Sequence, residues 1–358
     1  MSTNRLRVAL IGQGFMGKAH SNAYHQAGHF FDLPYELERE VLCGRNEATL
    51  GGMAARWGWR ETATDWRSVV ERPDIDVVDV AVPNHLHAEI ALAAAGAGKI
   101  VLCEKPLATS VEDARRMADA VRGRPSMVWF NYRRVAAVEL TRQLIYDGRL
   151  GDPFHYRGLY LQEWGNDPTR PPGWKTDAAQ AGSGVLGDIL SHSVDLALYL
   201  NGPISEVCAM QQTFASGRDV DDATLVLARF ANGSIGTLEA TRYATGAKNR
   251  NSYELHGSRG AVRFSLEDLN RLEFFDATEA KPLQAYRNIL VNETRFWKPG
   301  HILGYEHTFI AALGEFLLSL HRGELFHPDF DDALRVQLVL EAIAKSGNSR
   351  GWQTVELK

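Results

Sequence analysis

Three ionisable residues are spaced so that they share one face of a helix. Asp188, His192 and Asp195 are separated by four and then three positions, and residues at these spacings project from the same side of an α-helix. A histidine accepts a hydroxyl proton well near neutral pH, and such assistance is typically worth about 10²–10⁴-fold in rate. His192 is therefore a candidate proton acceptor, with Asp188 binding a substrate hydroxyl or fixing the imidazole tautomer. The alternative is that His192 and Asp195 are helix residues satisfied by their neighbours.

Polar residues also follow two apolar runs in the first third of the chain. Pro83, Asn84 and His87 follow one run, and Glu104 and Lys105 follow the next. An ammonium group at such a position stabilises negative charge that develops on a substrate oxygen. Lys105 is therefore a candidate catalytic residue, the alternative being an ordinary surface lysine. His85 and His87 lie two positions apart and therefore cannot share a helix face, so they predict no metal site.

A glycine signature lies between the first apolar run and a helical stretch. Gly12, Gly14 and Gly17 follow residues 6–11 and lead into residues 18–26. After a strand and before a helix, the first glycine allows a tight turn, the second lets the backbone approach a pyrophosphate, and the third permits close helix packing. The helix N-terminus then presents N–H groups to the phosphates. The pattern favours dinucleotide binding over a plain turn.

The end of the second expected strand bears on which dinucleotide is bound. An acid there accepts the ribose 2′-hydroxyl of NAD, whereas an arginine meets the 2′-phosphate of NADP. This chain has Arg45 and no acid before Glu47. NAD and NADP both stay open, and Arg45 tilts the expectation mildly toward NADP, with a solvated loop charge as the alternative. The expected nucleotide contacts are Gly12, Gly14, Phe15, Met16, Gly17, Arg45, Pro83, Asn84, His87, Glu104 and Lys105.

The elements that must position these residues alternate between strand and helix. Apolar runs at 41–43, 75–82 and 100–103 are separated by helical stretches at 47–57 and 85–95. Near-continuous apolar strands joined by helices indicate a parallel sheet covered on both faces. We therefore predict an α/β protein whose N-terminal domain is a doubly wound Rossmann sheet.

The pattern changes near residue 126, in a chain whose 358 residues exceed what one core usually organises. Strand-like runs then succeed one another, which indicates antiparallel pairing, and 224–230 with 234–240 is typical of a hairpin. We predict a Rossmann domain at 1–125 and, at 126–358, an α+β domain with a large open, mostly antiparallel sheet. Self-association would cover the open face of this sheet, which predicts a homodimer or homotetramer.

Aromatic and polar residues gather in the sequence around the helix that carries His192. Aromatic faces and polar side-chain tips suit sugar rings, although ordinary hydrophobic packing explains each residue about as well. The candidate substrate contacts are Tyr132, Arg133, Gln162, Trp164, Trp174, Asp188 and His192.

Three motifs in a fixed order give the chain a family resemblance. They are the glycine signature, Glu104-Lys105-Pro106, and the run GSGVLGDILSH that ends at His192. With these motifs the sequence resembles the Gfo/Idh/MocA oxidoreductases. The resemblance implies that Lys105, Asp188 and His192 form the catalytic and substrate-binding set and that Glu104 lies near the nicotinamide. Many members have glycine two residues after the motif aspartate, where this chain has Leu190.

Further runs narrow the resemblance within the family. Residues 14–24, 131–134 and 160–164 are similar to members that act on inositol and on anhydro sugars such as levoglucosan. The resemblance implies NAD(P)-dependent oxidation of a ring secondary hydroxyl of a sugar, anhydro sugar or cyclic polyol to a ketone. Two alternatives stay open: redox-neutral sugar modification with a recycled cofactor, and a catalytically silent, cofactor-bound sensor.

Composition restricts the partners and the compartment. The net charge of −5, with acids and bases interspersed, argues against a nucleic-acid or anionic-membrane partner. No segment approaches the roughly 20 apolar residues that span a bilayer. Cys43, Cys103 and Cys208 are dispersed, which indicates neither disulfides nor a zinc site and fits a reducing compartment. We expect a cytoplasmic protein with a small sugar or polyol as its partner and no bound metal.

Overall fold

The chain forms two compact units in its computed structural model, which describes residues 4–167, 169, 171, 173–291 and 295–356. The first unit consists of Met1–Asn131 and Gly304–Leu334, and the second of Tyr132–Leu303 and Arg335–Lys358. The first unit thus continues past residue 125 to Asn131. It also takes in a segment near residue 304 that the sequence pattern assigned to the second domain.

The first unit is built on a six-stranded parallel sheet with the order β3-β2-β1-β4-β5-β6. This order, in which the chain starts in the middle and winds outward in both directions, defines the doubly wound Rossmann fold and confirms the expected fold class. The strands are β1 (Asn4–Ile11), β2 (Tyr35–Cys43), β3 (Glu61–Ala63), β4 (Val77–Val80), β5 (Ile100–Cys103) and β6 (Ser126–Val128).

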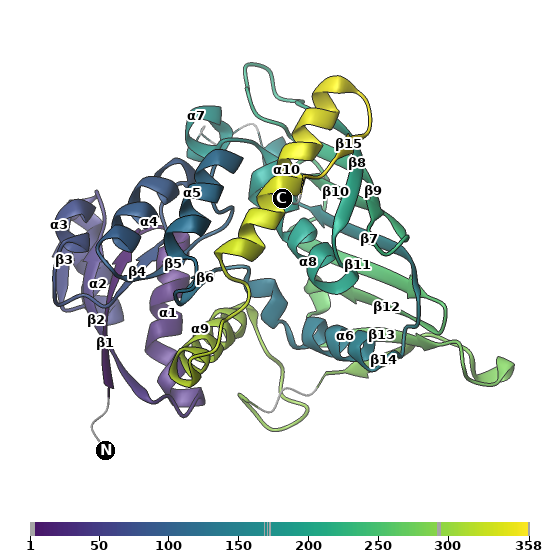
Figure 1. Cartoon of the computed structure of the whole chain (residues 1–358), viewed down its shortest axis with the longest axis horizontal. Coiled ribbons are helices and arrows are strands. Elements are labelled where there is room, and N and C mark those ends of the chain that lie inside the picture. The colour runs from purple at the N-terminus through teal and green to yellow at the C-terminus, as the bar shows by residue number, and fades with distance from the viewer. Residues whose placement is uncertain (1–3, 168, 170, 172, 292–294, 357–358) are drawn as a thin grey trace. The chain divides into compact units, whose positions relative to one another are not determined.

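Helices cover both faces of this sheet (Figure 1). Since each crossover between parallel strands is right-handed, the two directions of winding place their helices on opposite faces. The helices of the first unit are α1 (Phe15–Phe30), α2 (Glu47–Trp57), α3 (Trp66–Val70), α4 (His87–Gly96), α5 (Val111–Val121) and α9 (Tyr305–Arg322). Strand β1 is buried on both sides, with Val8, Ala9 and Leu10 inaccessible to solvent.

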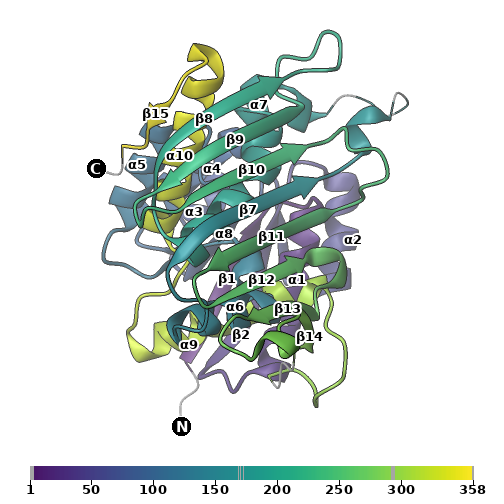
Figure 2. The same ribbon diagram turned by 90° about the vertical axis from the view of Figure 1, so that its right-hand side faces the viewer.

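The second unit is built on a nine-stranded sheet with the order β14-β13-β12-β11-β7-β10-β9-β8-β15, seen face-on in Figure 2. Its pairings are antiparallel except for that of β7 with β10, which is parallel. The expected hairpin is confirmed as β9 and β10. The strands are β7 (Pro153–Leu161), β8 (Ile204–Gln212), β9 (Ala223–Phe230), β10 (Ile235–Thr241), β11 (Arg250–Gly257), β12 (Gly260–Ser265), β13 (Arg271–Asp276), β14 (Arg287–Leu290) and β15 (Gln353–Thr354).

One face of the nine-stranded sheet is covered by helices. Helix α8 packs on β7, β10 and β11, and helix α6 packs on β12 and β13. The helices are α6 (Ala136–Tyr146), α7 (Ala178–Ala181), a π-helical turn (Leu186–Leu190), α8 (Ser191–Asn201) and α10 (Phe330–Ser349), the last of which begins in the first unit. Among the described residues, none of the helices has both the length and the hydropathy needed to cross a bilayer.

The other face of the sheet is open and partly apolar. Met210, Leu225, Leu227 and Ile235 are 62%, 41%, 51% and 55% exposed. In β9 buried and exposed residues alternate along the strand, because successive side chains of a strand point to opposite faces. Exposed leucine and methionine gathered on one sheet face are a feature of contact surfaces.

Candidate active site

The glycine turn after β1 has the geometry that the sequence predicts. Gly12 has φ 135°, and a Cβ atom there would lie 2.1 Å from the carbonyl oxygen of Ala81. A Cβ atom at Gly17 would lie 2.1 Å from the Gly12 oxygen, so the third glycine brings α1 close to the turn. At Gly14 the space is open. The turn therefore has no room for a side chain at positions 12 and 17, whereas the space at Gly14 is open, as the approach of a pyrophosphate requires.

The strand ends next to this turn carry the other predicted nucleotide residues. The parallel strands β1, β4 and β5 are neighbours, so the turns after them lie along one edge of the sheet. Phe15 is 70% exposed at the glycine turn. Its ring stacks on that of Tyr305 in α9, with the two ring centroids 6.4 Å apart. Met16 beside it is half-buried. Arg45 follows β2 directly and is exposed.

His87 ties the turns after β4 and β5 together. It is fully buried, and its two ring nitrogens lie 2.9 Å from the Pro106 oxygen and 3.0 Å from the Val82 oxygen. Burial lowers the pKa of His87, and the two carbonyl contacts only partly offset that effect. The buried Asn84 opens the short turn that precedes it. His87 thus positions the Lys105–Pro106 segment, whose peptide bond is cis.

Glu104 and Lys105 directly follow β5, and Glu104 is held by a buried network. One Glu104 oxygen lies 2.9 Å from Nε2 of His20, and the other accepts a hydrogen bond from the Lys105 backbone at 3.0 Å. Nδ1 of His20 lies 3.0 Å from Asp79. Trp129 and Tyr24 also donate to the Asp79 carboxylate, at 2.9 and 3.1 Å.

The charges of this network are coupled. Burial by itself would lower the pKa of His20, but the ion pair with Asp79 and the hydrogen bonds to Asp79 and Glu104 outweigh it and raise the pKa to about 9. An imidazolium between two carboxylates thus fixes Glu104 beside Lys105, which is half-buried. The sequence analysis missed His20 and Asp79. A carboxylate inside the apolar strand Val77–Val80 was the available signal, because a buried charge needs a partner.

In the second unit, Asp188 is held by two cations. It lies in the π-helical turn before α8, and π turns are frequent at functional sites. Nζ of Lys175 lies 2.9 and 3.1 Å from its two oxygens, and Nη2 of Arg242 lies 3.1 Å from Oδ2. Arg242 is fully buried and its guanidinium lies over the ring of Trp164, 4.6 Å from the centroid. Neither Lys175 nor Arg242 was named in advance as a site residue.

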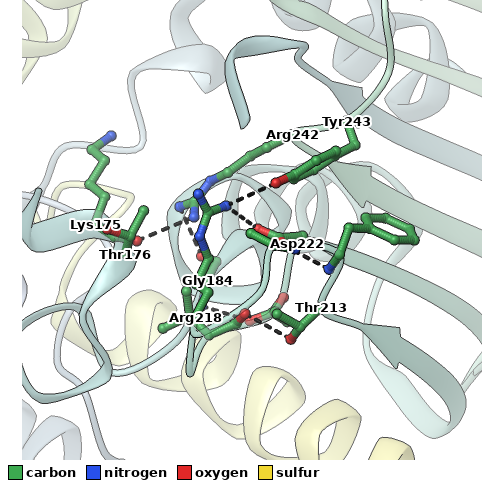
Figure 3. Close-up of polar contacts among 12 residues, drawn as sticks. Lys175, Thr176, Gly184, Thr213, Arg218, Asp222, Arg242 and Tyr243 are labelled. Carbon is green, nitrogen blue, oxygen red and sulfur yellow. Dashed lines mark hydrogen bonds and ion pairs between the residues drawn. The ribbon is translucent and has the colours of Figure 1, made fainter. Parts of the chain in front are cut away.

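Arg242 also organises the backbone of the GSG segment. Its guanidinium points toward Gly184 and the Lys175 backbone (Figure 3) and donates to both carbonyl oxygens at 3.2 Å. The Gly184 backbone N–H donates to the Asp221 carboxylate at 2.6 Å. A Cβ atom at Gly184 would lie 1.7 Å from the Asp221 carbonyl oxygen. This approach explains why the motif needs glycine there and shows how the turn that carries Asp188 is fixed.

His192 follows on α8 and lies against two tyrosines. It is 6% exposed, with ring centroids 4.6 Å from Tyr132 and 5.9 Å from Tyr160. The two tyrosine hydroxyls are 2.9 Å apart, and that of Tyr160 donates to Asn249 at 2.8 Å. Packing against these two aromatic rings restricts the orientation of the imidazole.

The hydrogen bonds continue from Asn249 to two more predicted pocket residues. Gln162 donates to Asn249 Oδ1 at 2.7 Å, and Nε1 of Trp164 donates to Gln162 Oε1 at 2.7 Å. The chain of contacts from Tyr132 to Trp164 therefore brings together three predicted substrate residues. Tyr160 and Asn249 complete it, and neither was named as a contact in advance.

Two other predicted residues have different surroundings. Arg133 is buried and makes three hydrogen bonds to Asp195 of α8, at 2.6 to 3.1 Å. Trp174 is half-buried, with the ammonium of Lys175 5.6 Å from its ring centroid. Asp195 is thus a helix residue satisfied by a neighbour. The place of Arg133 in substrate binding stays a prediction.

Comparison with known proteins assigns the family. The model of the oxidoreductase family with an NAD-binding Rossmann fold matches residues 6–132, and the Gfo/Idh/MocA C-terminal domain model matches residues 138–263. The chain therefore belongs to the Gfo/Idh/MocA family of oxidoreductases, as its motifs predict. It is an NAD(P)-dependent oxidoreductase acting on CH–OH groups.

Individual relatives match over nearly the whole chain. Levoglucosan dehydrogenase of Pseudarthrobacter phenanthrenivorans is 38% identical over 98% of both chains. A structure of levoglucosan dehydrogenase in complex with NADH superposes with a TM-score of 0.96 at 40% identity, covering 99% of this chain and 100% of the other. An oxidoreductase domain protein from Kribbella flavida gives a TM-score of 0.95 at 45% identity over 99% and 100% of the two chains.

Proposed function

We propose that this protein oxidises a ring secondary hydroxyl of a sugar, anhydro sugar or cyclic polyol to the ketone. The observation that carries the proposal is the arrangement around α8. There Asp188 is fixed by Lys175 and Arg242, while His192 lies against Tyr132, which begins a chain of sugar-suited polar contacts. The relatives named for levoglucosan and inositol dehydrogenation support a cyclic polyol as the substrate class.

The proposed steps divide one alcohol oxidation into a proton and a hydride transfer. His192 accepts the hydroxyl proton, and Lys105 stabilises the negative charge that appears on the oxygen. Asp188 accepts a hydrogen bond from a substrate hydroxyl and so orients the ring. A bound nicotinamide dinucleotide supplies the acceptor for the hydride that leaves the carbon. The alcohol thus loses one proton to His192 and one hydride to the dinucleotide, and its carbon becomes a carbonyl.

The glycine turn supports the placement of the dinucleotide. The clear space above Gly14 and the close contacts below Gly12 and Gly17 fit a pyrophosphate. Phe15, Met16, Arg45, Pro83, Asn84, His87, Glu104 and Lys105 complete the proposed nucleotide contacts. Tyr132, Arg133, Gln162, Trp164 and Trp174 are the proposed substrate contacts with Asp188 and His192.

We further propose that the protein is a homodimer or homotetramer in the cytoplasm. The open face of the nine-stranded sheet supports self-association, because exposed Met210, Leu225 and Leu227 lie on neighbouring strands. In a twofold-symmetric dimer formed through this face, these residues would pack against the same residues of the second subunit.

A panel assay tests the proposed reaction. Purified protein is offered NAD⁺ or NADP⁺ with levoglucosan, inositols and common pyranoses, and both the reduced nucleotide and the ketone are quantified. Equal amounts of the two support the proposal. A modified sugar without net nucleotide reduction would instead indicate redox-neutral chemistry. Nucleotide binding without any turnover would indicate a sensor.

A further inference from the structure

The loop that follows β2 lies beside the glycine turn. In the register of the parallel strands, Ile11 is paired with Cys43, and the Gly12 backbone N–H donates to the Cys43 oxygen at 2.9 Å. The residues directly after each strand, Gly12 and Gly44, are therefore neighbours. In Rossmann domains the adenine ribose is recognised at this position.

The side chain of Gln13 fills the space between the two turns. Its Nε2 donates to the Asn46 oxygen at 3.0 Å and to Oγ1 of Thr49 at 2.9 Å. Its Oε1 accepts the Asn46 backbone N–H at 2.9 Å. The amide of Gln13 thus clamps the loop after β2 with three hydrogen bonds.

Glycine at position 44 leaves room for this clamp. A Cβ atom there would lie 2.1 Å from Oε1 and 2.7 Å from Cδ of Gln13. The φ angle of Gly44 is not in the left-handed region, so the requirement comes from space and not from the backbone. A side chain at position 44, including a carboxylate that would accept the ribose hydroxyls, is excluded while Gln13 keeps its three contacts.

The same loop presents a cation. Arg45 is exposed and makes neither an ion pair nor a hydrogen bond with the part of the chain that the structure describes. The side-chain amide of Asn46 is exposed and similarly without a contact there. The first acid, Glu47, is the opening residue of α2. The loop therefore offers guanidinium and amide donors, which suit a phosphate monoester better than a ribose diol.

We propose that Arg45 and Asn46 bind the 2′-phosphate of NADP, and that the Gln13–Gly44 contact excludes the carboxylate that would select NAD. This inference rests on the proposed function and specifies its cofactor. It distinguishes the chain from the relative whose structure contains NADH.

Equilibrium binding tests the preference without turnover. Isothermal titration calorimetry of the full chain should give a dissociation constant for NADP⁺ at least about tenfold lower than for NAD⁺, the worth of one hydrogen bond to a charged group. In parallel, 2′,5′-ADP should raise the melting temperature more than 5′-AMP does. Equal or tighter binding of NAD⁺ would overturn this inference and leave the proposed function standing. Failure to bind either dinucleotide would overturn both.

Two sets of variants test the residues. Arg45→Ala should weaken NADP⁺ binding about tenfold or more with NAD⁺ binding unchanged. Arg56→Ala, which removes another exposed cation of the same unit, serves as the control and should change neither. An unchanged NADP⁺ affinity in Arg45→Ala would overturn the assignment.

The clamp is tested by a double-mutant cycle between positions 13 and 44. Gly44→Asp alone should not improve NAD⁺ binding, because the new side chain meets the Gln13 amide. Gln13→Ala together with Gly44→Asp should bind NAD⁺ more tightly than either single variant. Thermal unfolding of each variant verifies that it is folded. A gain in NAD⁺ affinity from Gly44→Asp alone, equal to that of the double variant, would show that Gln13 does not exclude a carboxylate.

Discussion

The buried guanidinium of Arg242 donates from Nη2 to Oδ2 of Asp188 across 3.1 Å. This pair joins the end of β10 to the π-helical turn that leads into α8. Because Arg242 also binds the Gly184 and Lys175 carbonyls, one side chain fixes both the carboxylate and the backbone that carries it. Arg242 is thus a positioning residue for Asp188, and it also binds the backbone of the GSG segment.

Arg242→Met should therefore damage both stability and substrate binding. Removing one partner of a buried ion pair destabilises a protein by up to about 3–5 kcal/mol, and the loss should lie at the lower end of this range because Lys175 still pairs with Asp188. Urea unfolding measures this loss, and steady-state kinetics should show a raised KM for the sugar. Arg242→Lys keeps the charge and should recover part of both. A KM that is unchanged in folded Arg242→Met would contradict a positioning role.

His192→Ala should lower kcat by about 10²–10⁴-fold, the usual contribution of a general base. Dinucleotide binding, measured by calorimetry, should stay as in the wild type, because the proposed nucleotide contacts lie in the first unit. His29→Ala, at an exposed position of α1, is the matched control and should keep full activity. Normal turnover by His192→Ala would rule out His192 as the proton acceptor.

Stability should fall as the pH rises through the alkaline range, because of His20. The folded-state pKa of about 9 lies above the value of about 6.5 expected for an unfolded chain. The stabilisation from the His20 ion pairs is therefore complete below about pH 6.5 and is lost as the pH rises through about 9. The difference in unfolding free energy between the wild type and His20→Gln should shrink over that range.

An NMR titration of the wild type tests the same point if His20→Gln does not fold. The His20 ring resonances should shift near pH 9. Titration of this ring near pH 6.5 would mean that Asp79 and Glu104 do not stabilise its charge.

Leu227→Asp should disrupt the proposed oligomer. Leu227 of β9 is 51% exposed on the open sheet face, and a buried unpaired carboxylate is strongly unfavourable. Sedimentation velocity should show a smaller species than the wild type at equal concentration. Tyr146→Asp, at the last residue of α6, where the side chain is 86% exposed, is the control. Identical sedimentation of the wild type and Leu227→Asp would exclude this face as the interface.

The strands and turns could be predicted from residues close together in the sequence, whereas the partners of the site residues come from distant parts of the chain. The strand-like run at 224–230 predicted β9, in which successive side chains point to opposite faces of the sheet and only one face is buried. The glycine turn was recognisable for a similar reason, since its residues are close in sequence. By contrast, Arg242 follows Asp188 by 54 residues and Glu104 follows His20 by 84. No periodicity links such partners, so the sequence indicated the carboxylates without their cations.

Helix α9 illustrates a second limit of sequence patterns. Its amphipathic pattern predicts a packed helix but does not name the surface that it covers. In the structure it contacts α1 of the first unit, and a Cβ atom at Gly314 would lie 2.5 Å from the Phe31 ring. A close contact of this kind depends on shape, which an apolar stripe does not specify.

Isotope transfer from a labelled substrate tests the central claim most directly. A cyclic polyol that the protein oxidises is deuterated at its ring carbinol carbons, and the reduced dinucleotide is analysed by mass spectrometry. The proposed reaction requires one deuterium on the nicotinamide ring for each ketone formed. Ketone formation with no deuterium in the nucleotide would contradict direct hydride transfer, and with it the account of this site.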